Sequence, residues 1–195
     1  MDEINELWEE LKFEVGSIGN ELLPADKREV LIGMGDRNAD ILFVGNDSKL
    51  YENENYKVES KSSGEFFLKL LDIAEYEPSS YYVTTLARRE VRFKNFSPED
   101  KEKLLDLLYM QIALIKPKII VFLGKEAAQS ILKREINFDE ERGAFVRWRG
   151  EIDSYLTYEI ETVITARNDG GKKSAIATNF WNDIKNIKAR LDSNE

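Results

Sequence analysis

The fold is indicated most clearly by residues 111–124, which read QIALIKPKIIVFLG. Pro117 ends the helix that precedes it, because proline has no amide hydrogen to donate and its ring clashes with the previous turn. The run from Lys118 to Leu123 has the length and apolar content of a buried strand, and Gly124 closes it. A further helix is expected over residues 125–133. This order of helix, strand and helix is typical of a parallel sheet in an α/β protein.

The same alternation continues on both sides of this stretch. Further strands are expected over residues 39–44, 81–86 and 162–165, and a hairpin over residues 144–158. Strands that alternate with helices imply right-handed crossovers, so the sequence predicts a three-layer α/β/α fold around a central four-stranded, mostly parallel sheet. No repeat, low-complexity tract or linker divides the chain, so residues 1–195 are expected to form one domain.

The composition restricts the chemistry that any site can use. The chain contains no cysteine and no histidine, so thiolate ligands, cysteine nucleophiles and the commonest general base are all missing. We therefore expect no cofactor and no metal, and any reaction must use carboxylates, lysine, arginine or hydroxyl groups. No segment reaches the ~18 to 20 apolar residues that a bilayer requires. The acidic first ten residues are unlike a signal peptide, so a cytoplasmic monomer without a membrane partner is expected.

The net charge of −9 is unevenly distributed. Residues 1–30 hold nine acidic and three basic side chains. Later segments are locally basic, and their cations are Arg88, Arg89, Arg92, Lys94, Arg142, Arg147, Arg149, Arg167, Lys172 and Lys173. Ligands of parallel sheets bind beyond the carboxyl ends of the strands, and two of the three basic clusters fall at such ends. These cations could bind an anion, or they could be solvated loops.

The order and spacing of several stretches resemble the family-four, thermostable-type branch of the uracil-DNA glycosylase superfamily. The resemblance runs from about Leu7 to Leu191 and is carried by residues 32–45, 63–64, 82–85, 111–124, 142–143 and 181–184. It implies a DNA partner and hydrolysis of the bond between a damaged or deaminated base and deoxyribose.

Several positions depart from that family. Its four iron–sulfur cysteines would fall near Ile18, Glu21, Arg89 and Leu104, which cannot ligate iron, and Leu104 reads as a packing replacement. Its histidine-containing motif near the last strand would fall at residues 166–169, where no histidine stands.

The residues that would read the base also differ. The base-reading asparagine would fall at Thr85, which offers fewer hydrogen bonds than an amide. The stacking aromatic residue would fall around residues 58–60, and Tyr51 and Tyr56 are the nearest substitutes or ordinary loop aromatics.

The first active-site loop of the resemblance corresponds to residues 45–49, in which Gly45 and Asn46 are expected to contact substrate. Asp47 resembles the water-activating acid of other branches of the superfamily. A turn cap is the alternative, because Asn-Asp-Ser is strong turn chemistry after a strand.

Other side chains are assigned to the leaving base and to the DNA backbone. Arg167 could replace the histidine at the leaving base and Asn168 could read a base edge, while a phosphate contact or a plain surface charge stays open for Arg167. The residues expected to contact DNA are Arg88, Arg92, Lys125 and Arg142.

Three functions follow as hypotheses. The first is a DNA-directed N-glycosylase, with a base preference that can differ from uracil. The second is a non-catalytic descendant that binds DNA or a protein partner. The third is a small-molecule nucleotide-binding module whose likeness to glycosylases is limited to the fold.

Overall fold

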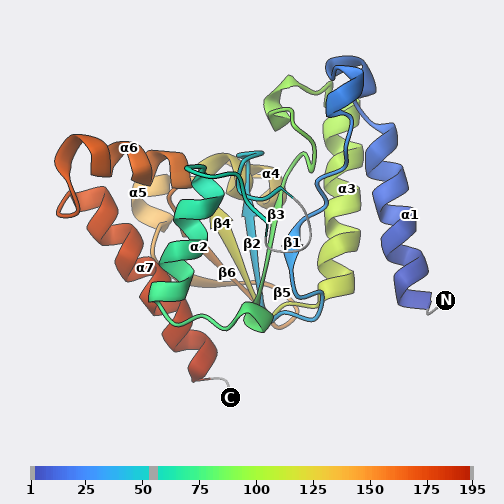
Figure 1. Ribbon diagram of the computed structural model, residues 1–195. Coiled ribbons are helices and arrows are strands. Elements are labelled where there is room, and N and C mark those ends of the chain that lie inside the picture. The colour runs from blue at the N-terminus through green and yellow to red at the C-terminus, as the bar shows by residue number, and fades with distance from the viewer. Residues whose placement is uncertain (1–2, 53–56, 194–195) are drawn as a thin grey trace.

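The computed structural model describes residues 3–52 and 57–193. Within these residues, six strands form one sheet in the order β1-β3-β2-β4-β6-β5 (Figure 1). The strands are β1 (Met34–Gly35), β2 (Ile41–Gly45), β3 (Tyr81–Thr85), β4 (Ile119–Leu123), β5 (Phe145–Arg149) and β6 (Ile152–Thr157). The inner four run parallel, and β1 and β5 pair antiparallel at the two edges. The predicted fold is confirmed, with one edge strand added on each side.

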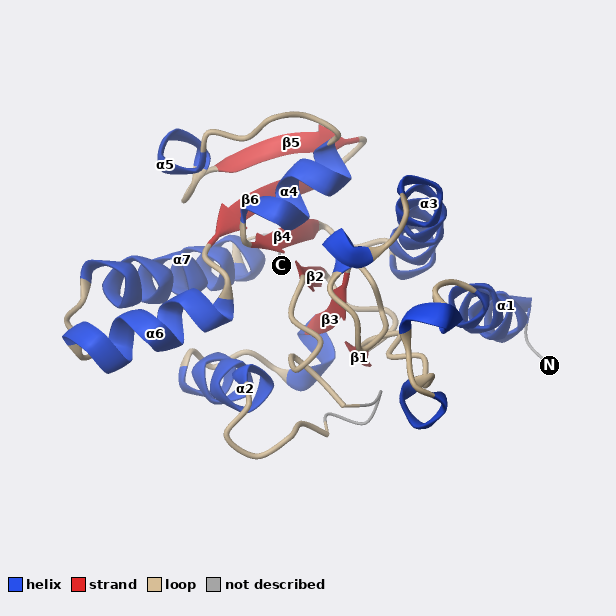
Figure 2. Cartoon of the chain, turned by 90° about the horizontal axis from the view of Figure 1, so that it is seen from above, coloured by secondary structure: helices blue, strands red, loops and turns tan. Residues whose placement is uncertain are grey.

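Helices cover both faces of the sheet, as the view from above shows (Figure 2). One face carries α1, α3 and α4, and the other carries α2, α6 and α7. The helices are α1 (Glu3–Ser17), α2 (Ser63–Ile73), α3 (Pro98–Ile115), α4 (Lys125–Leu132), α5 (Phe138–Glu141), α6 (Ile160–Gly170) and α7 (Ala175–Asp192). Short 3₁₀ turns lie at residues 20–22, 25–27, 78–80 and 93–95.

The two faces of the inner strands bury different apolar clusters. In β2, Leu42 and Val44 pack toward α1 and α3, whereas Ile41 and Phe43 pack toward α2 and α7. Side chains alternate between the faces of a strand, so a strand covered on both sides must be apolar throughout. This is why the short runs at β2 and β4 could be recognised from the sequence.

Capping residues set the starts of α2 and α3. Ser97 accepts a hydrogen bond from the amide of Asp100, and Pro98 stands at the first position of α3. Ser62 accepts one from the amide of Glu65 and starts α2 in the same way. At the other end of α3, Lys116 adopts the left-handed conformation with φ of 55° before Pro117.

The fourth parallel strand is not the predicted one. Residues 162–165 lie inside α6, and β6 takes their place beside β4. The predicted hairpin over residues 144–158 is present, but its second arm is this core strand. Asp153 and Ser154 obscured it in the sequence, because they are buried polar residues whose bonds to Arg190 and to the carbonyl of Val146 form only in the fold.

This correction changes which loop lies at the carboxyl end of the last parallel strand. That loop is residues 158–159, rather than the stretch near residue 166.

No helix among the described residues is long and apolar enough to cross a membrane.

Candidate functional site

The carboxyl ends of β2, β3, β4 and β6 lie together at one edge of the sheet. Between them is a small cavity, here called the rim cavity, of about 10 Å³. It is lined by Gly45, Asn46, Asp47, Leu50, Arg92, Leu123, Glu159, Ile160 and Glu161. This volume holds about one water molecule. Five of its nine residues are polar or charged. The cavity is lined by three residues that the sequence predicted at the substrate, namely Gly45, Asn46 and Asp47.

Asp47 is held at both carboxylate oxygens. Its Oδ1 accepts a hydrogen bond from the amide of Lys49 at 2.9 Å, and its Oδ2 accepts one from the Ser63 hydroxyl in the first turn of α2. The first of these bonds is the predicted turn cap. The same carboxylate lines the rim cavity, so the turn fixes a half-buried acid at the carboxyl end of β2.

Gly45 and Asn46 shape the floor of the loop. A Cβ at Gly45 would lie 2.5 Å from Cδ1 of Leu50, so a larger residue here would have to displace the Leu50 side chain. The Asn46 side chain donates to Oε2 of Glu126 at 2.5 Å, and its Oδ1 accepts from the amide of Phe93 at 3.4 Å. Asn46 therefore ties the loop after β2 to the start of α4 and to the loop after β3.

Arg92 is the cation of the rim cavity. It forms an ion pair with Glu161 at 2.9 Å, and both side chains are about half exposed. The hydrogen bond that Arg92 donates to Glu161 raises the pKa of Arg92, and the charges of Glu161, Asp47 and Glu159 act in the same direction. Of the four residues predicted to contact DNA, Arg92 is the one that lies beside Asp47.

Glu159 lines the same cavity and was not predicted. A Cβ at Gly124, where φ is 107°, would lie 2.2 Å from Cγ of Glu159, so this side chain packs directly on the start of α4. Burial raises the pKa of Glu159, and the nearby charges of Glu161, Glu126 and Asp47 raise it further, against an opposing effect of Arg92. The sequence concealed Glu159 because β6, which it follows, was interpreted as a hairpin arm.

Thr85 lies at the end of β3 with its hydroxyl already engaged. The amide of Arg88 donates to Oγ1 of Thr85 at 3.0 Å, and this hydroxyl lies 3.1 Å from the hydroxyl of Tyr51, which donates to the carbonyl of Leu31 at 2.5 Å. The side chains of Thr85, Arg88 and Tyr51 are all buried, and burial raises the pKa of Tyr51. The Thr85 hydroxyl therefore donates its proton to Tyr51, because the proton of Tyr51 is used for Leu31. Tyr56, the other predicted aromatic, lies outside the described residues.

Arg167 and Asp47 do not share a cavity. Arg167 stacks over the ring of Phe66 with 5.1 Å from Cζ to the ring centroid, and it lines a separate apolar groove between α2, α6 and α7. Asn168 follows it as an exposed residue near the end of α6. The prediction that Arg167 faces Asp47 at the leaving base is wrong, because the residues that end the last strand are 158–159.

Two of the predicted DNA contacts, Arg88 and Arg142, donate hydrogen bonds to groups within the protein. Arg88 has no exposed surface, and it donates to the Leu104 carbonyl and to Oε1 of Gln111. Arg142 donates to both carboxylate oxygens of the buried Asp183, at 2.9 and 2.8 Å. The buried Arg88 guanidinium cannot contact a phosphate, which corrects that expectation, whereas the Arg142 side chain keeps 22% exposure beside its ion pair and stays a prediction. Lys125 is exposed at the first residue of α4 and stays a prediction.

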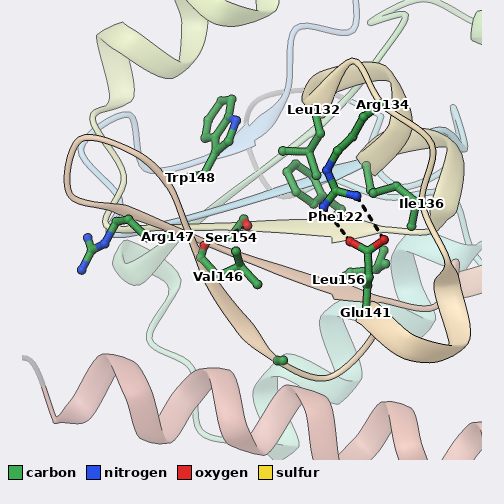
Figure 3. Close-up of a pocket in the computed structure, with 12 residues that line it drawn as sticks. Phe122, Leu132, Arg134, Ile136, Glu141, Val146, Arg147, Trp148, Ser154 and Leu156 are labelled. Atoms are coloured by element: carbon green, nitrogen blue, oxygen red, sulfur yellow. Dashed lines mark hydrogen bonds and ion pairs between the residues drawn. The ribbon is translucent and has the colours of Figure 1, made fainter.

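A larger cavity of about 160 Å³ lies between α4 and the β5–β6 hairpin (Figure 3). Phe122, Leu132 and Leu156 form its apolar lining, and the Arg134–Glu141 ion pair crosses its edge. No predicted site residue lines this cavity. In the part of the chain that the structure describes, no group of three or more acidic side chains is arranged to hold a metal ion.

These features define a class of protein, an α/β fold with an open, mostly parallel sheet and a polar site at the carboxyl ends of its parallel strands. A family model described as the uracil DNA glycosylase superfamily matches residues 32–185, and the chain belongs to that superfamily. It is 29% identical over 136 residues to a type-4 uracil-DNA glycosylase from Archaeoglobus fulgidus. The alignment covers 69% of this chain, which spans 64% of the length of that relative. The resemblance drawn from the sequence is thereby confirmed.

Proposed function

We propose that the protein is a DNA N-glycosylase that removes a damaged or deaminated base, with Asp47 as the carboxylate that positions water. The observation that carries this proposal is the placement of Asp47, which is held by Ser63 and the Lys49 amide beside Arg92 in the rim cavity. Membership of the superfamily supports DNA as the substrate.

The reaction suits this pair of side chains. Loss of a base gives the sugar oxocarbenium character, so a carboxylate near C1′ stabilises the developing positive charge and orients the attacking water. The base leaves with the bonding electron pair, and donors near its oxygen stabilise that negative charge. Arg92 offers a permanent charge and several donors at the same cavity.

A base does not fit the rim cavity as it stands, since the cavity holds about one water molecule. Leu50 lines it, and the neighbouring Tyr51 occupies the hydroxyl of Thr85. We therefore propose that a flipped nucleotide displaces these two side chains. Extruding a base from the stack costs a few kcal/mol, which contacts to the DNA backbone must offset.

The test is cleavage of single- and double-stranded oligonucleotides that carry uracil, hypoxanthine or xanthine. Asp47→Asn keeps the shape of the side chain and its turn while removing the charge, so we expect at least a ~100-fold loss of cleavage with an unchanged melting temperature. Asp36→Asn is the matched control, because Asp36 caps a similar turn through the Asn38 amide at 2.8 Å and does not line the rim cavity. Wild-type rates in Asp47→Asn would remove Asp47 from the mechanism.

A second function is favoured by one observation, the closed state of the rim cavity with Thr85 engaged. A non-catalytic descendant would bind DNA without turnover. Its binding would weaken steeply with salt, because phosphate contacts release counterions. Binding that persists without cleavage of any of the three bases would select this function over the first.

A further inference from the structure

Three of the four positions that the family resemblance assigns to cluster cysteines lie together in the structure. Nη1 of Arg89 donates to the carbonyl of Ile18 at 2.8 Å, and Glu21 is close enough for its charge to act on Arg89. At the fourth position, Leu104 is a buried core residue whose carbonyl accepts from Arg88. None of these side chains is a thiolate, so the residues present do not fit an iron–sulfur cluster.

The Arg89 guanidinium occupies this place with no exposed surface. Its two terminal nitrogens reach five acceptors, of which four lie within residues 15–20 and one at residue 28. These are the carbonyls of Val15 (3.1 Å), Gly16 (3.2 Å), Ile18 (2.8 Å) and Arg28 (3.1 Å), and Oδ1 of Asn20 (2.7 Å). Burial lowers the pKa of Arg89, and the charge of Arg28 acts in the same direction against that of Glu21. A buried charge is tolerated when it is densely hydrogen-bonded in this way.

Two of these acceptors are carbonyls at the end of a helix. The carbonyls of Val15 and Gly16 belong to the last turn of α1, where helical carbonyls have no partner within the helix and where a cation is favoured by the helix dipole. A Cβ at Gly19, where φ is 71°, would lie 2.3 Å from Cε1 of Phe96. The segment of residues 15–28 is thus closed on the loop of residues 86–96 at Arg89 and again at Phe96.

The same loop carries the cation of the rim cavity. Arg92 stands three residues after Arg89, and the amide of Phe93 donates to Asn46 in the loop of Asp47. On the other side of Arg89, the carbonyl of Arg88 accepts from the amide of Leu31 at 2.8 Å. Arg89 is therefore linked to the rim cavity through three residues of chain and the hydrogen bond between Phe93 and Asn46.

We propose that Arg89 is a positioning residue that replaces the iron–sulfur cross-link of the family with a buried guanidinium, and so fixes Arg92 at the rim cavity. One side chain with five acceptors can join several segments of chain, as a metal cluster does, without iron or cysteine. The role assigned to Arg92 rests on the proposed function, whereas the cross-link does not.

The test is hydrogen exchange of the whole protein with Arg89→Met, Arg89→Lys and the control Arg134→Met. Arg134 is also hydrogen-bonded, but on the surface to Glu141. We expect amides of residues 16–28 and 89–95 to exchange at least about tenfold faster in Arg89→Met while the inner strands keep their protection. Arg89→Lys, with three donors on one nitrogen, should recover part of the protection, and Arg134→Met should behave as wild type.

Two outcomes would overturn the inference. One is wild-type protection of both segments in a folded Arg89→Met variant. The other is a uniform rise of exchange through β2 and β4 as well, which marks general loss of stability. If Arg89→Met does not fold, Arg89→Lys decides, and wild-type protection of residues 16–28 in that variant overturns it. The exchange readout needs no cleavage, so this failure is distinct from failure of the glycosylase proposal.

Discussion

At the scale of single residues, the environment decides what each charged side chain can do. Arg88 and Arg92 stand four positions apart on one loop, yet one is a core residue and the other lines the rim cavity. Asp47 and Glu159 likewise share a cavity with different surroundings. Asp47 accepts hydrogen bonds at both oxygens, whereas burial and neighbouring acids raise the pKa of Glu159.

The raised pKa of Glu159 makes its contribution to stability depend on pH. Between its unfolded pKa, near 4.5, and its raised folded pKa, the folded protein holds a proton that the unfolded chain has lost. Stability from this group is thus complete below about pH 4.5 and is lost as pH rises through the folded value. Glu159→Gln removes that loss, because glutamine stays neutral.

We therefore expect Glu159→Gln to raise the melting temperature by about 2 °C at pH 7.5 and to leave it unchanged at pH 4. Glu140→Gln is the control, since Glu140 is exposed on α5 and does not line the rim cavity. Calorimetric scans at the two pH values measure the difference. An equal or lower melting temperature for Glu159→Gln at pH 7.5 would contradict the assignment.

At the scale of elements, the junctions between strands and helices build the site. The loop after β6 meets the start of α4 at Gly124, where the backbone is left-handed and no room exists for a side chain. This contact places Glu159 in the rim cavity. The cap of α2 at Ser62 similarly places Ser63 beside Asp47.

Gly124→Ala should therefore disturb both stability and the site. The added Cβ must displace Glu159 and adopt a strained φ, so we expect a loss of about 3 kcal/mol in the free energy of unfolding. Gly150→Ala is matched, because Gly150 also has a positive φ of 54° but no atom within 4 Å of the added Cβ. It should cost only about 1 kcal/mol. Urea denaturation measures both, and equal losses would show that the contact with Glu159 is unimportant.

At the scale of the whole molecule, the distribution of charge constrains the proposed binding of DNA. The protein carries a net charge of −9, and residues 3–30 of the acidic N-terminal segment form α1 and the turns after it. Much of the positive charge predicted to face DNA is buried or paired, as at Arg88 and Arg142. Of the predicted DNA contacts, Lys125 and the half-exposed Arg92, which is paired with Glu161, lie beside the carboxyl ends of the strands.

Binding should consequently depend on very few phosphate contacts. Lys125→Glu is expected to weaken DNA binding about tenfold in low salt and to reduce the slope of log affinity against log salt by about one. Lys185→Glu changes the charge equally on α7 and should matter less. Fluorescence anisotropy over a salt series measures both quantities. A larger effect of Lys185→Glu would place the DNA on the face covered by α7.

The sequence by itself determined the class of fold, the β2 and β4 strands, the start of α3 and the absence of a cysteine-ligated cluster. These features depend on local patterns: apolar runs of strand length, a serine cap followed by proline, and composition. The family resemblance also followed from the order of such patterns, and it singled out Asp47, which lines the rim cavity.

The tertiary structure alone decided which side chains meet. It exchanged residues 162–165 for β6, brought Glu159 rather than Arg167 to Asp47, and turned Arg88, Arg89 and Arg142 inward. The physical reason is that a polar side chain is buried only when partners distant in sequence satisfy it, and those partners are chosen by packing. The sequence around Arg89 therefore does not reveal that its guanidinium binds five carbonyl and amide oxygens.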